Sequence, residues 1–259
     1  MFINNINPVL LSLGPLQIRY YGLVYALGFL AAYYLIYKFS KEGKIKNMTS
    51  ERSDILTLYM IIGGIAGGRL FHFIFYNLAS LIQNPLELFY IWHGGMSFHG
   101  GLLGMAFAIW LFCRRYHVSF YKVADLIAIP SAFFLFLGRV ANFINSELVG
   151  IVTNSEKTPW CVVFEKVDDA CRHPSQLYEA GKNLLIFGTL MMMRLKGKLK
   201  DGIAFWTFIL MYGTLRFITN IWRDDPRLYG ISTGQFLSLL MIPVAIYFLW
   251  KINRKKPLH

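Results

Sequence analysis

Acidic side chains are scarce in this sequence, and charge of either sign is limited. The 259 residues include 14 Asp and Glu against 26 Lys and Arg, so the formal net charge at pH 7 is +12. Charged residues make up only 15% of the chain, whereas apolar residues make up 56%. This composition is too apolar for an ordinary soluble domain and is typical of an integral membrane protein.

Motifs of many enzyme classes are also missing. The sequence has no metal-ligand spacing of Cys, His or carboxylates, no nucleophile elbow, no Walker loop and no dinucleotide fingerprint, so we expect neither a metal nor a cofactor. Of only three cysteines, Cys113 ends an apolar run. Cys161 and Cys171 lie in a polar segment, where an oxidising compartment would permit a disulfide. Two reduced thiols without a role are the alternative.

Long apolar runs, in contrast, are abundant. Several segments approach the ~20 residues that a helix needs to cross a bilayer, so we predict one all-α membrane domain over residues 1–259 with about seven transmembrane helices. The segments are Tyr20–Tyr37, Ile55–Tyr76, Phe98–Cys113, Val123–Leu137, Gln176–Met193, Gly202–Ile221 and Gly234–Trp250. The polar residues 151–175 interrupt this pattern, and we expect them to form a small head outside the membrane.

The distribution of basic residues predicts the orientation. With the N-terminus outside and seven crossings, most lysines and arginines fall in the inside connections, as the positive-inside rule requires, which gives N-out and C-in. They are Lys38, Lys41, Lys44, Lys46, Arg52, Arg114, Arg115, Lys122, Arg194, Lys196, Lys198, Lys200, Lys251, Arg254, Lys255 and Lys256. Nucleic-acid binding is the rival use of a basic chain, but we do not expect it because these residues lie in short loops between helices.

One polar run follows an apolar stretch directly. In G-R-V-A-N-F-I-N-S-E-L-V-G (138–150), Arg139 is followed by Asn142 and Glu147. An ionisable group at membrane depth indicates a functional site, because its burial is expensive. On one continuous helix Arg139, Asn142 and Ser146 would share a face, with Glu147 nearby. The alternative is a structural Arg–Glu pair that locks two helices together.

Two further arginines and a histidine lie in apolar segments. Arg216 follows Tyr212 by one helical turn, which places both on one face. Arg69 follows a glycine-rich run that favours helix packing, and it either makes a structural pair or contacts a substrate. His99 lies among glycines in H-G-G-M-S-F-H-G-G-L-L-G. It is either a helix-interface residue or an acid, base or phosphate donor.

Few carboxylates are available to neutralise these arginines. The candidates in the apolar segments or beside them are Glu147, Asp125 and Glu179. Because a guanidinium group binds phosphate bidentately, the surplus of arginine predicts an anion. The anion most available inside a membrane is a phospholipid head group. The residues therefore predict a phospholipid-binding membrane protein, and a lipid transporter or a non-catalytic scaffold remain alternatives to an enzyme.

Long motifs across nearly the whole chain resemble those of the bacterial prolipoprotein diacylglyceryl transferases, in the expected order. They are R-Y-Y-G-L-V-Y-A-L-G-F (19–29), G-G-M-S-F-H-G-G-L-L-G (94–104), the run 138–150, R-H-P-S-Q-L-Y-E (172–179), Y-G-T-L-R (212–216) and S-T-G-Q (232–235). One departure is Asn220, where we expect an acidic residue in some relatives. The resemblance therefore assigns no ion pair there with Arg216 or Arg223.

The resemblance implies a reaction and a location. A diacylglyceryl group would move from phosphatidylglycerol to the lipobox cysteine thiol in the signal peptide of a preprolipoprotein. A thioether would form and glycerol phosphate would leave, as the first step of lipoprotein maturation. The enzyme would be a multi-pass protein of the bacterial plasma (inner) membrane, with its active face toward the periplasmic side. Its partners would be these substrates and membrane lipid.

The resemblance also implies site residues. The expected catalytic residues are His99, Arg139, Arg216 and Glu147. The expected phosphatidylglycerol-binding residues are Arg139, Asn142, Tyr21, Tyr212, Gly150 and Arg223. His99 is the candidate base, and Glu147 would position an arginine or receive the thiol proton. Arg139 and Arg216 would bind the phosphate and stabilise the charge that develops on the leaving group.

Overall fold

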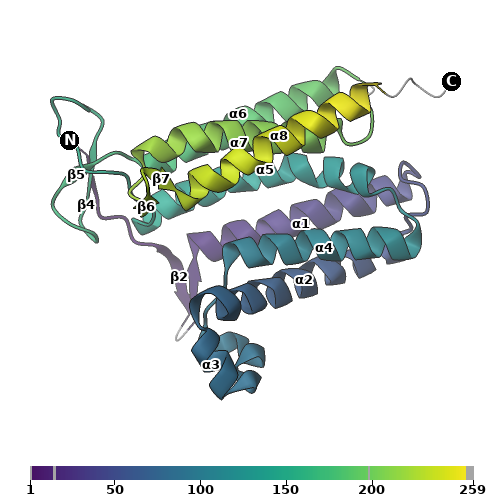
Figure 1. The fold of residues 1–259 in the computed structure, drawn as a ribbon, viewed down its shortest axis with the longest axis horizontal. Helices are drawn as coiled ribbons and strands as arrows, with labels where there is room; N and C mark the ends of the chain where they lie inside the picture. The colour runs from purple at the N-terminus through teal and green to yellow at the C-terminus, as the bar shows by residue number, and fades with distance from the viewer. Residues whose placement is uncertain (1, 14–15, 198, 255–259) are drawn as a thin grey trace. The chain divides into compact units, whose positions relative to one another are not determined.

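Six of the seven predicted apolar segments lie within a single helix, and the seventh, Gly202–Ile221, covers one helix and the beginning of a short 3₁₀ helix. A computed structural model describes residues 2–13, 16–197 and 199–254, and its helices are drawn in Figure 1. The long ones are α1 (Tyr20–Lys41), α2 (Ser50–Tyr76), α4 (Phe98–Tyr116), α5 (Phe120–Asn145), α6 (Ser175–Leu195), α7 (Ile203–Thr219) and α8 (Thr233–Arg254). Of the described helices, 4 are long and apolar enough to cross a membrane, namely α1, α2, α5 and α8. The mostly helical membrane fold is therefore confirmed, whereas seven crossings stay a prediction.

Short helices and strands make up the rest of the described structure. The short helices are α3 (Leu78–Gln83), η1 (Pro85–Phe89), η2 (Ile91–His93) and η3 (Asn220–Trp222). The strands are β1 (Phe2–Asn4), β2 (Val9–Leu13), β3 (Leu16–Arg19), β4 (Val162–Phe164), β5 (Cys171–Arg172), β6 (Arg227–Leu228) and β7 (Ile231–Ser232). By its contacts the chain divides into two compact units, residues 1–32 with 124–259 and residues 33–123. We call them the first and the second unit.

In the second unit, α2 and α4 pack closely through glycine (Figure 1). Gly63 and Gly67 of α2 face Gly100 and Gly104 of α4, so closely that a Cβ atom on Gly104 would lie 2.1 Å from the Gly63 carbonyl oxygen. This small-residue contact is the packing device that the glycine-rich run before Arg69 predicts. The glycines on both sides of the contact therefore have a structural reason.

Arg69 on α2 organises the connection between α2 and α4. Its side chain is only 2% exposed, and its guanidinium donates to five backbone carbonyl oxygens. The acceptors are Glu87, Leu88, Tyr90, Gly94 and Gly95. Of the two alternatives from the sequence, a structural role and a substrate contact, these bonds support the structural one, because they use the donors of the guanidinium on the chain itself.

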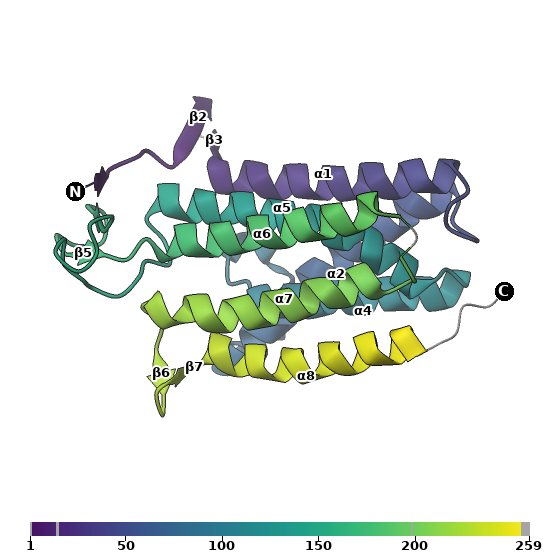
Figure 2. The same ribbon diagram turned by 90° about the horizontal axis from the view of Figure 1, so that it is seen from above.

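In the first unit, α5, α6 and α7 share a hydrophobic core, and α8 runs beside α7 (Figure 2). Ala132 of α5, Ile186 and Leu190 of α6 and Ala204 of α7 are all buried in that core. Asp125 of α5 accepts hydrogen bonds from backbone N–H groups of residues 202 and 205 at the beginning of α7. This carboxylate therefore caps a helix, where the helix dipole favours negative charge, instead of neutralising an arginine.

The motif S-T-G-Q (232–235) begins α8 as a capping box. The backbone N–H of Gln235 donates to the Ser232 hydroxyl at 3.1 Å, and the Ser232 N–H donates to Gln235 Oε1 at 3.1 Å. Each side chain thereby satisfies a backbone donor of the other residue. Asn220 Nδ2 also donates to the Ser232 hydroxyl at 2.6 Å, so the cap ties the end of α7 to the beginning of α8.

The polar segment 151–175 contains strands as well as loops. Antiparallel β4 and β5 form a three-stranded sheet with β1, which pairs with β4 in parallel. A disulfide joins Cys161 to Cys171, which decides between the two alternatives for these cysteines. An all-α domain is predicted, but the first unit also contains strands. One of them, β1, comes from the chain near the N-terminus and pairs with this segment.

The α2–α4 contact gives a stability prediction. Gly104→Ala should lower the free energy of unfolding by about 1–3 kcal/mol, the usual cost of overpacking. Thermal unfolding in detergent measures the change. Gly188→Ala is the matched control, because no heavy atom lies within 4 Å of a Cβ atom at that position. Equal melting temperatures for the two variants would contradict the close approach of the helices.

Candidate functional site

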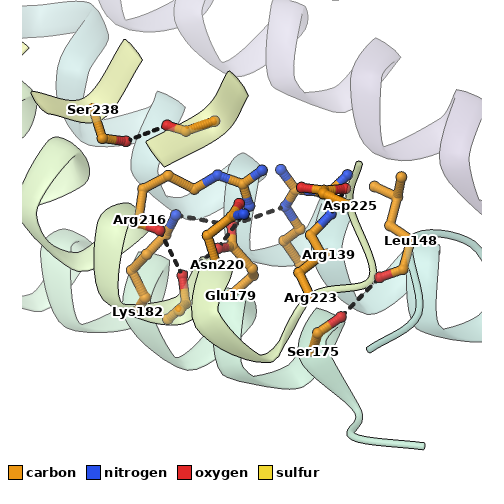
Figure 3. Close-up of polar contacts among 12 residues, drawn as sticks. Arg139, Leu148, Ser175, Glu179, Lys182, Arg216, Asn220, Arg223, Asp225 and Ser238 are labelled. Carbon is orange, nitrogen blue, oxygen red and sulfur yellow. Dashed lines mark hydrogen bonds and ion pairs between the residues drawn. The ribbon is translucent and has the colours of Figure 1, made fainter. Parts of the chain in front are cut away.

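A buried carboxylate, Glu179 of α6, lies at the centre of a cluster of cations (Figure 3). Its Oε1 is 2.8 Å from Nη1 of Arg216, and its Oε2 is 2.8 Å from Nζ of Lys182. The Thr219 hydroxyl also donates to Oε1. The Glu179 side chain is only 2% exposed, and a carboxylate is tolerated at such burial only when it is paired and hydrogen-bonded.

Two more arginines extend the cluster. Nε of Arg139, on α5, lies 3.6 Å from Glu179 Oε2, and Nη1 of Arg139 donates to Asn142 Oδ1 at 3.3 Å. Arg223, which follows η3, pairs through Nε with Asp225 Oδ1 at 2.8 Å. Figure 3 shows the three guanidinium groups gathered on one side of Glu179. We call Arg139, Lys182, Arg216 and Arg223, with their two carboxylates, the cation cluster.

The cation cluster has more positive than negative charge. Arg139, Lys182 and Arg216 share the single carboxylate of Glu179, whereas Arg223 has its own partner in Asp225. Within the described residues, the four cations of the cluster therefore share two carboxylates, which leaves an excess of two positive charges. Such an excess of preorganised cations stabilises a bound anion, and guanidinium groups favour phosphate.

The helix that carries Arg139 ends earlier than predicted. The sequence predicts one continuous helix through Ser146 and Glu147, but α5 ends at Asn145. Ser146 and Leu148 adopt left-handed backbone conformations, with φ values of 60° and 57°. The helical conformation ends at this turn, so Ser146 does not extend the helical face of Arg139 and that prediction is wrong.

The turn directs the Glu147 carboxylate back toward α5. Its Oε2 accepts a hydrogen bond from Asn142 Nδ2 at 2.8 Å, and its Oε1 accepts one from Asn145 Nδ2 at 3.2 Å. Glu147 therefore reaches Arg139 through Asn142. The carboxylate that pairs with Arg139 directly, and so links two helices, is Glu179 of α6.

Residues at the beginning of α6 hold this strained turn. The Ser175 hydroxyl donates to the Leu148 carbonyl oxygen at 2.8 Å (Figure 3), and Gln176 Nε2 donates to the Glu147 carbonyl oxygen at 2.7 Å. A left-handed conformation costs free energy for a residue other than glycine and persists only when its surroundings fix it. The motif 172–179 thus supplies both Glu179 and the contacts that shape the turn.

Gly150 lies where three chain segments meet. Its N–H donates to the His173 carbonyl oxygen at 3.1 Å, and the next N–H, of Ile151, donates to the Trp222 carbonyl oxygen at 3.0 Å. A Cβ atom on Gly150 would lie 2.3 Å from the His173 oxygen, so only glycine allows this approach. The contact places the backbone beside Arg223, to which Gly150 forms an isolated β-bridge.

Arg172 fastens the same junction from the head segment. Its Nη1 donates to the Gly150 carbonyl oxygen at 3.0 Å and pairs with Asp224 at 2.9 Å. Its Nε and Nη2 bind the Asp168 carboxylate. The Arg172 guanidinium holds the pKa of the Asp168 carboxyl below its usual range. Since Asp224 is the neighbour of Arg223, the Arg172 network fixes the backbone that carries this arginine.

Sequence comparison identifies the family. The family model described as prolipoprotein diacylglyceryl transferase matches residues 8–251. The chain belongs to the prolipoprotein diacylglyceryl transferase family. The resemblance seen in the sequence motifs is therefore confirmed.

Relatives of similar length support this membership of the transferase family. A protein of Legionella pneumophila (strain Paris) is 39% identical over 252 residues, covering 95% of this chain and 97% of the relative. One of Solidesulfovibrio magneticus is 40% identical over 264 residues, covering 99% and 98%. One of Geobacter sulfurreducens is 38% identical over 257 residues, covering 97% of each chain. All three are named phosphatidylglycerol–prolipoprotein diacylglyceryl transferase.

Several site residues expected for a diacylglyceryl transferase lie in the first unit. Arg139, Arg216 and Arg223 belong to the cation cluster, and the Tyr212 ring centroid lies 4.1 Å from Lys182 Nζ. The Tyr21 hydroxyl, on α1, makes a hydrogen bond of 2.9 Å with Tyr25 one turn later. The structure assigns no direct contact between Tyr21 and the cation cluster among the described residues.

His99 belongs to the second unit. It lies in the first turn of α4, but its side chain is outside the part of the structure that is described. In the sequence, the glycines beside His99 favour a functional role. Gly100 and Gly104 have instead a packing reason, since they meet α2 directly. The glycine setting therefore no longer distinguishes between the two alternatives for His99.

The expected site residues omit three carboxylates that the structure connects to the arginines. Glu179 is one of the three candidate acids from the sequence, whereas Asp224 and Asp225 are not among them. The i, i+3 spacing of Glu179 and Lys182 on one helix face is a signal for their ion pair. Asn220 stands where some relatives are expected to have an acidic residue. Asp225, in the following loop, supplies the acidic partner of Arg223 instead.

The Arg172 network gives a pH prediction. Because the pKa of Asp168 is lower in the folded protein than in the unfolded chain, its stabilising effect is present above about pH 4 and is lost as the pH falls through the folded pKa. Melting temperatures of the native protein and Asp168→Asn should therefore differ at pH 7, and the difference should shrink as the pH falls below about 4. A difference that persists unchanged at acid pH would contradict the ionic origin. Comparison with the variant cancels the effect of other groups that titrate, such as His173.

Proposed function

We propose that this chain transfers the diacylglyceryl group of phosphatidylglycerol to the lipobox cysteine thiol in the signal peptide of a preprolipoprotein. The observation that carries the proposal is the positive excess of the cation cluster in a membrane protein of this family. A phosphodiester head group supplies the anion that these arginines accommodate. The reaction is the first step of lipoprotein maturation.

The chemistry is a displacement at carbon. The thiol sulfur attacks the carbon of the diacylglyceryl group that carries the phosphate ester. A C–S bond forms there, and the bond between this carbon and the phosphate oxygen breaks. Glycerol phosphate leaves with the electron pair of the C–O bond, and the thiol proton passes to a base. A free cysteine has a pKa near ~8.5, so removing this proton raises the concentration of the reactive thiolate. His99 is the proposed base.

The leaving group needs fixed positive charge. Arg139 and Arg216 stabilise the negative charge that develops on the phosphate oxygen, and they are already anchored by Glu179 before the reaction begins. Asn142 orients the Arg139 guanidinium and is held in turn by Glu147. We therefore assign Glu147 to positioning rather than to proton transfer. Tyr21, Tyr212, Gly150 and Arg223 complete the proposed head-group site.

The proposed location is the bacterial inner membrane, with seven crossings, an outer N-terminus and an active face toward the periplasm. The excess of basic residues in the inner connections supports this orientation. A fluorescent protein fused after residue 254 should fluoresce, and alkaline phosphatase fused at the same point should be inactive. Active phosphatase would place the C-terminus outside and contradict the orientation.

The activity itself is tested with purified components. Detergent-solubilised protein, phosphatidylglycerol and a lipobox peptide should yield a peptide that is heavier by one diacylglyceryl group, together with free glycerol phosphate. A peptide with serine in place of the cysteine should stay unmodified. A lipid transporter or a binding scaffold would give no covalent product, and that result would contradict the proposal.

Arg139→Ala should lower the transfer rate by about 10²–10³-fold, because it removes one positioned cation from the leaving group. Arg216→Ala and His99→Ala should be similarly impaired while still inserting into the membrane. Arg115→Ala is a matched control, since this exposed arginine of α4 lies outside the proposed site. Full transfer by purified Arg139→Ala would overturn the assignment. A lower protein level with normal specific activity would indicate a structural Arg139.

A further inference from the structure

A lysine lies in the cation cluster at a depth where lysine is rare. The Lys182 side chain is only 2% exposed, and it approaches the cluster from α6, one turn after Glu179. A buried ammonium group is costly unless it is paired, and Lys is almost never fully buried without a partner. Its partners are Glu179 Oε2 at 2.8 Å and the Tyr212 ring, with 4.1 Å between Nζ and the ring centroid.

These contacts leave Lys182 no surface to offer a substrate. Its ammonium lies between a carboxylate and an aromatic ring, and its side chain is nearly inaccessible. Arg139 and Arg216, in contrast, are 15% and 11% exposed. The arginines are therefore the cations that can reach an anion, whereas Lys182 acts on other side chains of the cluster.

Lys182 and Arg139 compete for the same oxygen atom. Lys182 Nζ lies 2.8 Å from Glu179 Oε2, and Arg139 Nε lies 3.6 Å from it, beyond hydrogen-bond distance. The other oxygen, Oε1, is taken by Arg216 and by the Thr219 hydroxyl. Because Lys182 binds Oε2, the Arg139 guanidinium lies near the carboxylate but does not form a close ion pair with it.

We infer that Lys182 is a positioning residue that keeps Arg139 available for the phosphate of the lipid substrate. This inference rests on the proposed function. Without the ammonium group, Arg139 is the nearest cation to Oε2 and closes on it as a full ion pair. This closure weakens binding of the lipid anion and does not concern the peptide substrate.

The test is Lys182→Met, which keeps the length of the side chain and removes its charge. The KM for phosphatidylglycerol should rise roughly 10-fold, the size expected for weakening one charged hydrogen bond, while the KM for the lipobox peptide stays the same. A purely structural defect would change both values together. Lys157→Met is the matched control, since it removes one charge from an exposed loop of the same unit.

A second variant shows whether Lys182 acts through Glu179. In the Glu179→Gln background there is no carboxylate for Arg139 to close on, so adding Lys182→Met should change lipid affinity by less than about 2-fold. Native mass spectrometry of phosphatidylglycerol bound to detergent-solubilised protein measures this without requiring activity. An equal loss of affinity in both backgrounds would overturn the inference, because Lys182 would then act independently of Glu179.

The remaining outcomes are also decisive. An unchanged lipid KM in Lys182→Met, or equal increases for lipid and peptide, would overturn the inference. If neither Lys182→Met nor Lys182→Gln accumulates in the membrane, the lysine is structural and the inference fails. Failure of the proposed function looks different, because the unmodified protein would then produce no thioether product at all.

Discussion

The first unit depends on one shared carboxylate. Glu179 is buried on α6, and its two oxygens accept a lysine of the same helix, an arginine of α7 and, more loosely, an arginine of α5. Three helices thus meet through one negative charge, in addition to their apolar core. Because three cations share this charge, the pairing holds the helices together and still leaves positive charge for a ligand.

Arg139 and Arg216 are placed by helices, but Arg223 is placed by loops. It follows η3, and its position depends on the backbone contacts of Gly150 and on the Arg172 network. Arg172 lies beside Cys171, so the disulfide closes the segment that supports this network. Rigid helices therefore supply two of the arginines, and a cross-linked head segment supplies the support for the third.

Charged residues at membrane depth serve two different purposes in this chain. Arg69 gives all its described hydrogen bonds to carbonyl oxygens of the connection between α2 and α4, and so it organises the fold. Among the described residues, Arg139 makes one hydrogen bond to a side chain and one loose ion pair, and so it retains donors for a ligand. Burial alone does not separate these roles; the partners of each guanidinium do.

The sequence by itself determined the helical segments, the membrane class, the family and the surplus of arginine, because hydropathy, charge and motifs are properties of local sequence. Only the tertiary structure decided the partners. It assigned Glu179 to the arginines and Asp125 to a helix cap, ended α5 at Asn145 through contacts from α6, and paired β1 with β4. These outcomes depend on residues distant in sequence, and their proximity arises only when the helices pack.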